Sequence, residues 1–136
     1  MLAFHIDGLH KRYPKFHLDD VSFSLEQRFI MGFIGINGAG KTTTLKSLLN
    51  LSRPDSGSVE ILGKDPFQHD DELELKQELG VVLGDKDLYK QYRIGKTTDV
   101  VSCFYREWDQ EVYDRYCREF DLDQEKKLGE LSEGMR

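Results

Sequence analysis

The 136-residue sequence has only two cysteines, no long hydrophobic run and no excess of positive charge. Its longest mostly apolar run, 29–36, has eight residues, whereas a helix needs about 20 to span a bilayer. The first residues reach Asp7 before an apolar stretch can form, which excludes a secretory signal peptide. We therefore expect no membrane-spanning segment in this sequence and a cytoplasmic location.

The scarce cysteines and the negative charge exclude further classes. Cys103 and Cys117 lie fourteen residues apart, with no Cys-x-x-Cys pair and no flanking histidine. This spacing favours two reduced, packed thiols over a redox or zinc site. The formal net charge of −6 and the pI of about 5.2 disfavour a general affinity for nucleic acid or anionic lipid. Nucleic acid is therefore not an expected partner.

Short apolar stretches predict a β-rich first part with one helix. Leu45, Leu48 and Leu49 recur at helical spacing after Lys41, so a helix is expected to follow the glycine-rich stretch 35–40. A turn is expected at 54–57, and the state of the polar segment 66–78 is left open. The expected strands cover 2–6, 19–25, 28–34, 58–62 and 80–83.

The last third has an amphipathic helical pattern instead. Asp109 is the expected N-cap between two helices, and a further helix could begin within 128–136. The apolar positions at helical spacing are Val100, Val101, Phe104 and Tyr105, then Val112, Tyr116 and Phe120.

The strongest motif is Gly-Ile-Asn-Gly-Ala-Gly-Lys-Thr at 35–42, which matches the Walker A pattern Gly-x-x-x-x-Gly-Lys-Ser/Thr. A glycine-rich loop between a strand and a helix aims backbone N–H groups and a helix N-terminus at one anion. Lys41 would place its charge on the β and γ phosphates, and Thr42 would offer its hydroxyl to Mg²⁺. Thr43 is either a donor to the α-phosphate or a solvent-facing helix residue. The predicted nucleotide-binding residues of the loop are Gly35, Asn37, Gly38, Ala39, Gly40, Lys41, Thr42 and Thr43.

The surroundings of this motif resemble the nucleotide-binding domain of ATP-binding cassette (ABC) transporters. Residues 33–44 resemble that family's Walker A stretch, and 53–65 resemble its following turn and strand. Leu-Ser-Glu-Gly-Met-Arg at 131–136 is similar to the signature sequence, in the variant form of bacterial exporters that pair with separate permeases. Residues 104–111 also resemble that bacterial subgroup.

The resemblance implies roles for three further residues. Tyr13 stands where the family has the aromatic ring that stacks on adenine, although Phe16 is close enough to compete, and Tyr13 could also be an ordinary surface residue. Ser132 and the backbone at Gly134 would contact the γ-phosphate held by a second nucleotide-binding subunit.

Two departures from the family pattern matter. Gly84 stands where the family has a glutamine that reaches Mg²⁺ and the attacking water, and Asp85 could substitute only if the loop shifts by one residue. The sequence stops at the signature, without counterparts of the Walker B aspartate, the catalytic glutamate and the switch histidine. We therefore expect a truncated or frameshifted ABC domain that has no catalytic residue of its own and binds ATP without turnover.

These patterns together predict an α/β fold, the N-terminal portion of a P-loop NTPase. It would comprise a small antiparallel β part and a P-loop strand–helix unit within 1–85, and a helical subdomain at 86–136. The resemblance implies an ATP-binding subunit of a bacterial exporter, using ATP and Mg²⁺ and coupling hydrolysis to export. Its partners would be an integral-membrane permease, which holds it at the inner face of the cell membrane, and a second nucleotide-binding subunit. A small P-loop kinase or GTPase, and a non-catalytic nucleotide- or partner-binding module, remain alternatives.

Overall fold

The computed structural model describes residues 1–82 and 90–132. The chain divides by packing into two units, 1–78 and 79–136, each of which is described by itself. The predicted boundary between 85 and 86 falls outside the described residues and stays a prediction. The first unit contains β1 (Leu2–Tyr13), β2 (Phe16–Glu26), α1 (Lys41–Leu48), β3 (Ser56–Ile61) and α2 (His69–Glu78). The second contains α3 (Ile94–Ser102), α4 (Gln110–Glu119) and a 3₁₀ helix at Leu128–Glu130.

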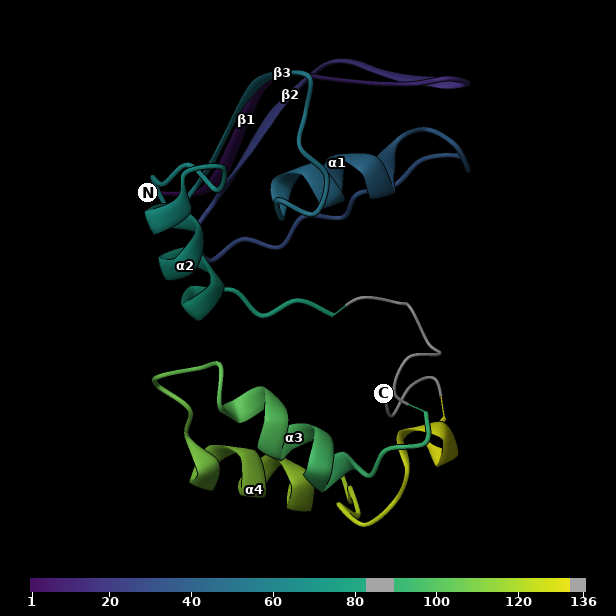
Figure 1. Ribbon diagram of the computed structural model, residues 1–136, viewed down its shortest axis with the longest axis vertical. Coiled ribbons are helices and arrows are strands. Elements are labelled where there is room, and N and C mark those ends of the chain that lie inside the picture. Colours follow the sequence, from purple (N-terminus) through teal and green to yellow (C-terminus); the bar gives the residue numbers. More distant parts are fainter. Residues whose placement is uncertain (83–89, 133–136) are drawn as a thin grey trace. The chain divides into compact units, whose positions relative to one another are not determined.

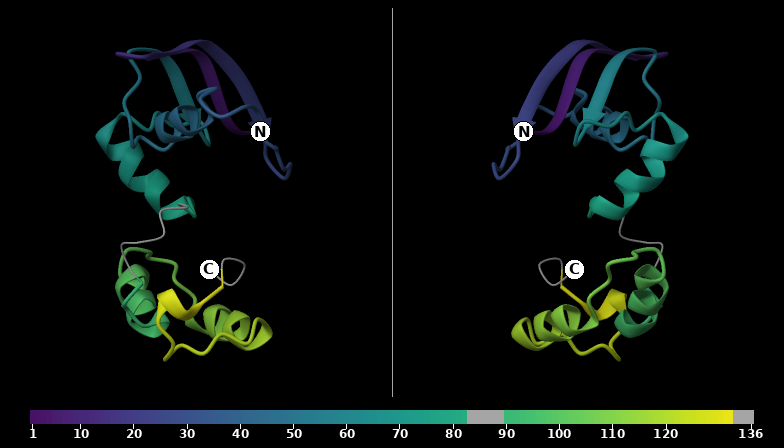
Figure 2. Two further views of the ribbon diagram at one scale, coloured as in Figure 1. Left: turned by 90° about the vertical axis from the view of Figure 1, so that its right-hand side faces the viewer. Right: turned by 90° about the vertical axis from the view of Figure 1, so that its left-hand side faces the viewer.

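The first unit is built on an antiparallel sheet in the order β2-β1-β3. The strands expected at 2–6, 19–25 and 58–62 are confirmed, and the first two extend into a long hairpin whose last pair is Tyr13 with Phe16. Ile6 and Leu9 on β1 are fully buried, and Val59 and Ile61 on β3 are buried as well. Helix α1 lies along one face of the curved sheet (Figures 1 and 2), so this face carries the core.

The start of β3 depends on one glycine. Gly57 has a φ of +93°, and a Cβ placed on it would meet the carbonyl oxygen of Gly8 at 2.3 Å. Any larger residue would therefore separate β3 from β1 and also pay for a left-handed backbone. The turn expected at 54–57 is shorter in the structure: Asp55 forms a bend, and Ser56 and Gly57 already belong to β3.

Two of the expected strands are wrong. Residues 29–36 follow β2 as an extended segment without strand pairing, and residues 80–82 are likewise irregular, while Leu83 lies outside the described residues. A strand requires a neighbouring strand to complete its hydrogen bonds, and the described residues supply none beside these segments. Ile30 and Ile34 are consequently almost fully exposed, although their apolar pattern resembles a buried strand.

The polar segment whose state the sequence left open contains α2. Its first turn carries Asp70, Asp71 and Glu72, which suit the positive N-terminal end of the helix dipole, while its last turn carries both Lys76 and Glu78. Leu75 is its buried residue. Capping charges and one apolar contact thus suffice for a helix that lacks a clear apolar stripe.

The second unit is helical, as predicted. Asp109 is confirmed as the N-cap of α4, since its side chain accepts a hydrogen bond from the Val112 amide at 3.0 Å. Helix α3 ends at Ser102, one turn earlier than the apolar spacing suggested, and Phe104 is exposed beyond it. Of the stretch where a further helix was expected, Leu128–Glu130 forms a short 3₁₀ helix.

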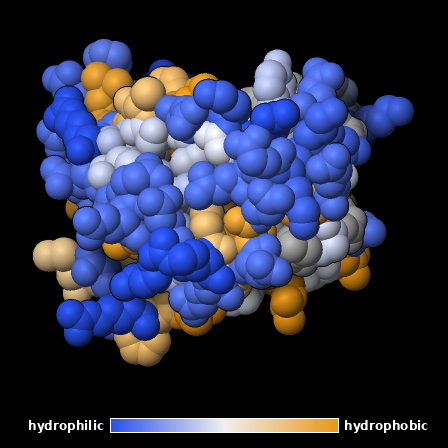
Figure 3. Space-filling view, turned by 90° about the horizontal axis from the view of Figure 1, so that it is seen from below, coloured by the Kyte–Doolittle hydropathy of each residue, from blue (hydrophilic) through white to orange (hydrophobic). Residues whose placement is uncertain are grey.

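The cysteine prediction holds for one residue and fails for the other. Cys117 is buried on α4, whereas Cys103 follows the end of α3 and is exposed, and both are free thiols. Cys103 lies beyond the last helical turn, and its Sγ donates to the Asp99 carbonyl oxygen rather than packing in the core. The face of the helical unit in Figure 3 is mostly hydrophilic, with separate apolar spots. Among the described residues, no helix is both long and apolar enough to cross a membrane.

Candidate nucleotide site

The phosphate loop leads directly into α1. Gly40 is the N-cap of this helix and has a φ of +95°, and Lys41 is the first helical residue. The Lys41 ammonium donates hydrogen bonds to the carbonyl oxygens of Gly35 at 2.6 Å and Ile36 at 2.8 Å. These two bonds curl the loop around the lysine and use two of its three protons, so a third proton remains for an anion.

Three consecutive threonines begin the helix, and helical geometry gives them different surroundings. Thr44 is 1% exposed, and its hydroxyl donates to the Gly40 carbonyl oxygen at 3.1 Å. Thr42 is exposed and Thr43 is half-buried, because successive side chains turn by about 100° around the axis. Thr44 therefore anchors the helix start from inside, while Thr42 and Thr43 line the pocket at the loop.

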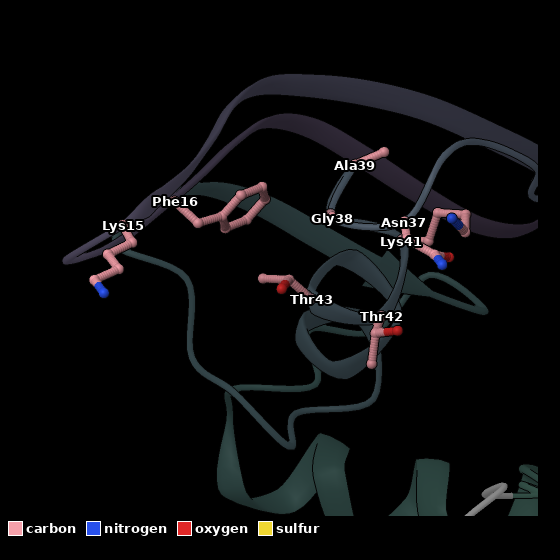
Figure 4. Close-up of a pocket in the computed structure, with 9 residues that line it drawn as sticks. Lys15, Phe16, Asn37, Gly38, Ala39, Lys41, Thr42 and Thr43 are labelled. Atoms are coloured by element: carbon pink, nitrogen blue, oxygen red, sulfur yellow. The ribbon is translucent and has the colours of Figure 1, made fainter.

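An open pocket of about 450 Å³ lies at this helix start. In Figure 4, Phe16 and Thr43 project toward each other, while Lys15 points away from them. Seven of the predicted loop residues line the pocket, whereas Gly35 does not line it and only accepts a hydrogen bond from Lys41. The lining residues are Lys15, Phe16, Asn37, Gly38, Ala39, Gly40, Lys41, Thr42 and Thr43.

The β1–β2 hairpin closes one side of the pocket. A Cβ on Gly40 would meet Leu18 Cδ1 at 2.8 Å and Phe16 Cζ at 2.9 Å. Phe16 and Leu18 are two residues apart on β2, so they share the face that rests on the loop. Gly40 is thus needed both for its left-handed backbone and for the close approach of the hairpin.

Tyr13 lies at the end of β1 and does not line the pocket. Its ring is 6.4 Å from the Phe16 ring, and its hydroxyl shares a 3.2 Å hydrogen bond with Ser52 Oγ. The ring is 40% exposed and therefore open to a ligand from solvent. Of the two aromatics that the sequence offered, Phe16 faces the loop and Tyr13 stands beside it.

The other predicted site residues lie in the second unit or outside the described residues. Ser132 is exposed directly after the buried Leu131. Gly134 lies outside the described residues, and so do Gly84 and Asp85.

The chemistry of the pocket favours an anion. Its described lining contains two lysines, two threonine hydroxyls, loop amides and no carboxylate. No group of three or more His, Cys, Asp or Glu within 1–82 and 90–132 could hold a metal ion.

Two contributions were missed by sequence reasoning. Lys15 belongs to the pocket lining, and Leu18 packs behind the loop. The second strand was expected only at 19–25, so Phe16 and Leu18 fell outside it, and no sequence signal showed that their side of the hairpin meets the loop.

Comparisons with known proteins agree with this geometry. A family model described as ABC transporter matches residues 18–136. The chain is 45% identical over 67 residues to the doxorubicin resistance ATP-binding protein DrrA of Mycobacterium tuberculosis, which covers 47% of this chain and 20% of that protein. It is 45% identical over 56 residues to the bacitracin transport ATP-binding protein BcrA of Bacillus licheniformis, which covers 41% of this chain and 18% of that protein.

Solved structures show the same fold. The ATP-binding subunit of an ABC transporter matches with a TM-score of 0.80 at 24% identity, over 98% of this chain and 57% of the other. A nucleotide-free ATP-binding cassette matches with a TM-score of 0.71, also at 24% identity, over 97% of this chain and 60% of the other. The chain therefore spans somewhat more than half of these structures and aligns with about a fifth of the length of the curated relatives. From its phosphate loop, its fold and the family match over residues 18–136, we conclude that this chain belongs to the ABC transporter family.

Proposed function

We propose that this chain binds ATP through the pocket at the start of α1, as part of an ATP-binding subunit that drives export. The observation that carries the proposal is the arrangement of Lys41, the loop amides and Phe16 around one opening. The loop and lysine suit a polyphosphate, and an aromatic ring beside them suits a nucleobase. The family match decides against a small P-loop kinase or GTPase.

The residues of the loop divide the work of binding. Lys41 neutralises charge on the β and γ phosphates, and the backbone of Gly38, Ala39 and Gly40 wraps the phosphate oxygens. A Cβ on Gly38 would meet nothing within 4 Å, so the loop has open space there for a ligand to approach. Thr43 would donate to the α-phosphate, and Tyr13 or Phe16 would contact the adenine.

Mg²⁺ fits the donor set at Thr42. This ion prefers oxygen ligands and keeps several waters, so one hydroxyl together with phosphate oxygens is a sufficient set. Thr42 is exposed at the helix start and free to turn its hydroxyl toward the loop. When bound, Mg²⁺ would supply positive charge to the phosphates, and the protein would supply this one hydroxyl.

We further propose that residues 1–136 bind ATP without turnover. Activation of water requires a carboxylate within about 2.6–3.2 Å of it, and the described lining of the pocket holds none. Asp85, the candidate that the sequence offered, lies outside the described residues. A binding module without catalysis and a complete ATPase would differ in whether such a carboxylate is present and ATP is turned over.

The remaining parts of the proposal concern the whole transporter. Relatives named for doxorubicin resistance and bacitracin transport support an export role. The chain would pair with an integral-membrane permease at the cytoplasmic face of the membrane and with a second nucleotide-binding subunit. Ser132 and Gly134 would act on the nucleotide that this second subunit holds.

The deciding experiment is ATP binding by Lys41→Ala, measured by calorimetry. Charge-assisted contacts to phosphate contribute more than neutral ones, so ATP binding should weaken by about 1.5–3 kcal/mol. Lys46→Ala is the matched control, because it removes a lysine from the last turn of the same helix. Equal affinity in the two variants would contradict the proposed site.

A further inference from the structure

The tip of the β1–β2 hairpin carries both candidate aromatics but has little packing of its own. Arg12, Tyr13, Pro14 and Lys15 are all exposed. A two-stranded tip of this kind is marginally stable in water unless something outside the hairpin holds it. What holds it determines where the rings stand relative to the phosphate loop.

Asp55 contacts three consecutive residues of β1 just before the tip. Its carboxylate accepts from Lys11 Nζ at 2.9 Å and from the Arg12 amide at 2.7 Å, and its own amide donates to the His10 carbonyl oxygen at 2.8 Å. The hydrogen bonds from Lys11 and from the Arg12 amide lower the pKa of Asp55 below its ordinary value. The charged carboxylate therefore holds this part of β1 through hydrogen bonds.

Ser52 adds a second contact three residues earlier. Its Oγ shares the 3.2 Å hydrogen bond with the Tyr13 hydroxyl, and its amide donates to the Lys46 carbonyl oxygen at the end of α1. Lys11 Nζ also lies 5.8 Å from the centre of the Tyr13 ring, a cation–π distance. Tyr13 is thus held on its hydroxyl end and over its face.

Both Ser52 and Asp55 belong to the segment that follows α1. This helix begins at the phosphate loop and, at eight residues, is about 12 Å long. One end of α1 holds the phosphate loop and the other end leads into the segment that holds the hairpin. The distance between the phosphates and the aromatic tip is then set by a short rigid element.

We propose that Asp55 is a positioning residue for nucleotide binding, which acts through Lys11, the Arg12 amide and the adjacent Ser52–Tyr13 bond to fix the aromatic tip above the phosphate loop. This inference rests on the proposed ATP site. It assigns Asp55 no contact with the nucleotide, and it predicts that the base end of the ligand, not the phosphate end, depends on this residue.

The test compares ATP with inorganic tripolyphosphate, which has phosphates and no base, by calorimetry on the full 136-residue chain. Asp55→Asn keeps an acceptor for the Arg12 amide and removes the charge that Lys11 needs. When this substitution makes the ATP-binding position of the tip a minor state, ATP affinity should fall in proportion to the population of that state, about fivefold here. Tripolyphosphate affinity should stay within about twofold of its original value. Asp55→Glu should recover part of the ATP affinity, and Ser52→Ala should give a smaller loss of the same selectivity.

Glu74→Gln is the matched control, because it breaks the Lys64–Glu74 ion pair elsewhere in the same unit. It should change neither ligand. Equal weakening of both ligands in Asp55→Asn and in Ser52→Ala, or no change in either variant, would overturn the positioning role while leaving the ATP site in place. Failure of the unmodified chain to bind either ligand would overturn the proposed function and this inference together.

Discussion

Different interactions stabilise the interior of each of the two units of this chain. In the first, buried residues such as Ile6 and Val59 meet across strands that are some fifty positions apart, and Gly57 lets two backbones touch. In the second, the Thr98 hydroxyl donates to the Tyr113 hydroxyl at 2.8 Å, and an N-cap defines where α4 begins. The first unit depends on a sheet of paired strands, whereas the second combines capped helices with backbone hydrogen bonds between 90–95 and 124–129. The candidate phosphate site belongs wholly to the first unit.

The largest expected effect breaks the first unit alone. Gly57→Ala adds a Cβ 2.3 Å from the Gly8 carbonyl oxygen at a left-handed backbone position, and should destabilise the first unit by about 3 kcal/mol. Hydrogen exchange measured peptide by peptide should show faster exchange in 2–26 and 56–61. The fluorescence transition of Trp108, the single tryptophan of the sequence, should move much less.

Gly63→Ala is the control for this substitution. Its φ of +79° carries the same kind of backbone strain, but nothing lies within 4 Å of the added Cβ. The expected loss of stability is about 1 kcal/mol, because Gly63→Ala adds backbone strain but no steric overlap. If the two variants lose equal stability, close approach of β3 to β1 is not what holds the sheet.

An intermediate effect should appear in the second unit. Asp109→Ala removes the acceptor for the Val112 amide and should cost about 1 kcal/mol, seen as a lower urea midpoint of Trp108 fluorescence. Asp109→Asn keeps an acceptor of similar capping strength and should lie near the original midpoint. A larger loss in the strand peptides than in the Trp108 signal would mean that the cap acts beyond its own unit.

The smallest effect concerns acid. Hydrogen bonds from Lys11 and from Lys76 lower the pKa values of Asp55 and Glu72 below their ordinary 3.8 and 4.5. A lowered folded-state pKa contributes stability that is complete above the unfolded-state value and is lost as pH falls through the folded-state value. The protection of strand peptides, relative to the intrinsic exchange rate at each pH, should therefore fall below about pH 4, and Asp55→Asn should reduce that dependence. Both carboxylates are solvent-screened, so a pH response as large as the Gly57→Ala effect would contradict this account.

Local signals were predictable from the sequence wherever one short stretch carries the whole physical reason. The Walker A spacing located the loop, and Asp109 was recognisable as a cap because a carboxylate there meets an unpaired amide three residues later. The state of 66–78 stayed open because its charges, not its apolar spacing, favour α2. The stretch 28–34 was misassigned because its apolar run matches a buried strand, whereas strand pairing depends on a neighbour elsewhere in the chain.

The sequence by itself determined the phosphate loop, the helix that follows it and the family, because glycine backbone freedom and a following lysine act within eight residues. The tertiary structure decided which aromatic faces that loop and what holds it. Pairing of Tyr13 with Phe16 at the hairpin tip, and the return of Ser52 and Asp55 to that tip, depend on strand register and on chain segments some forty residues apart. Such contacts form only when the sheet is assembled, so no local sequence pattern predicts them.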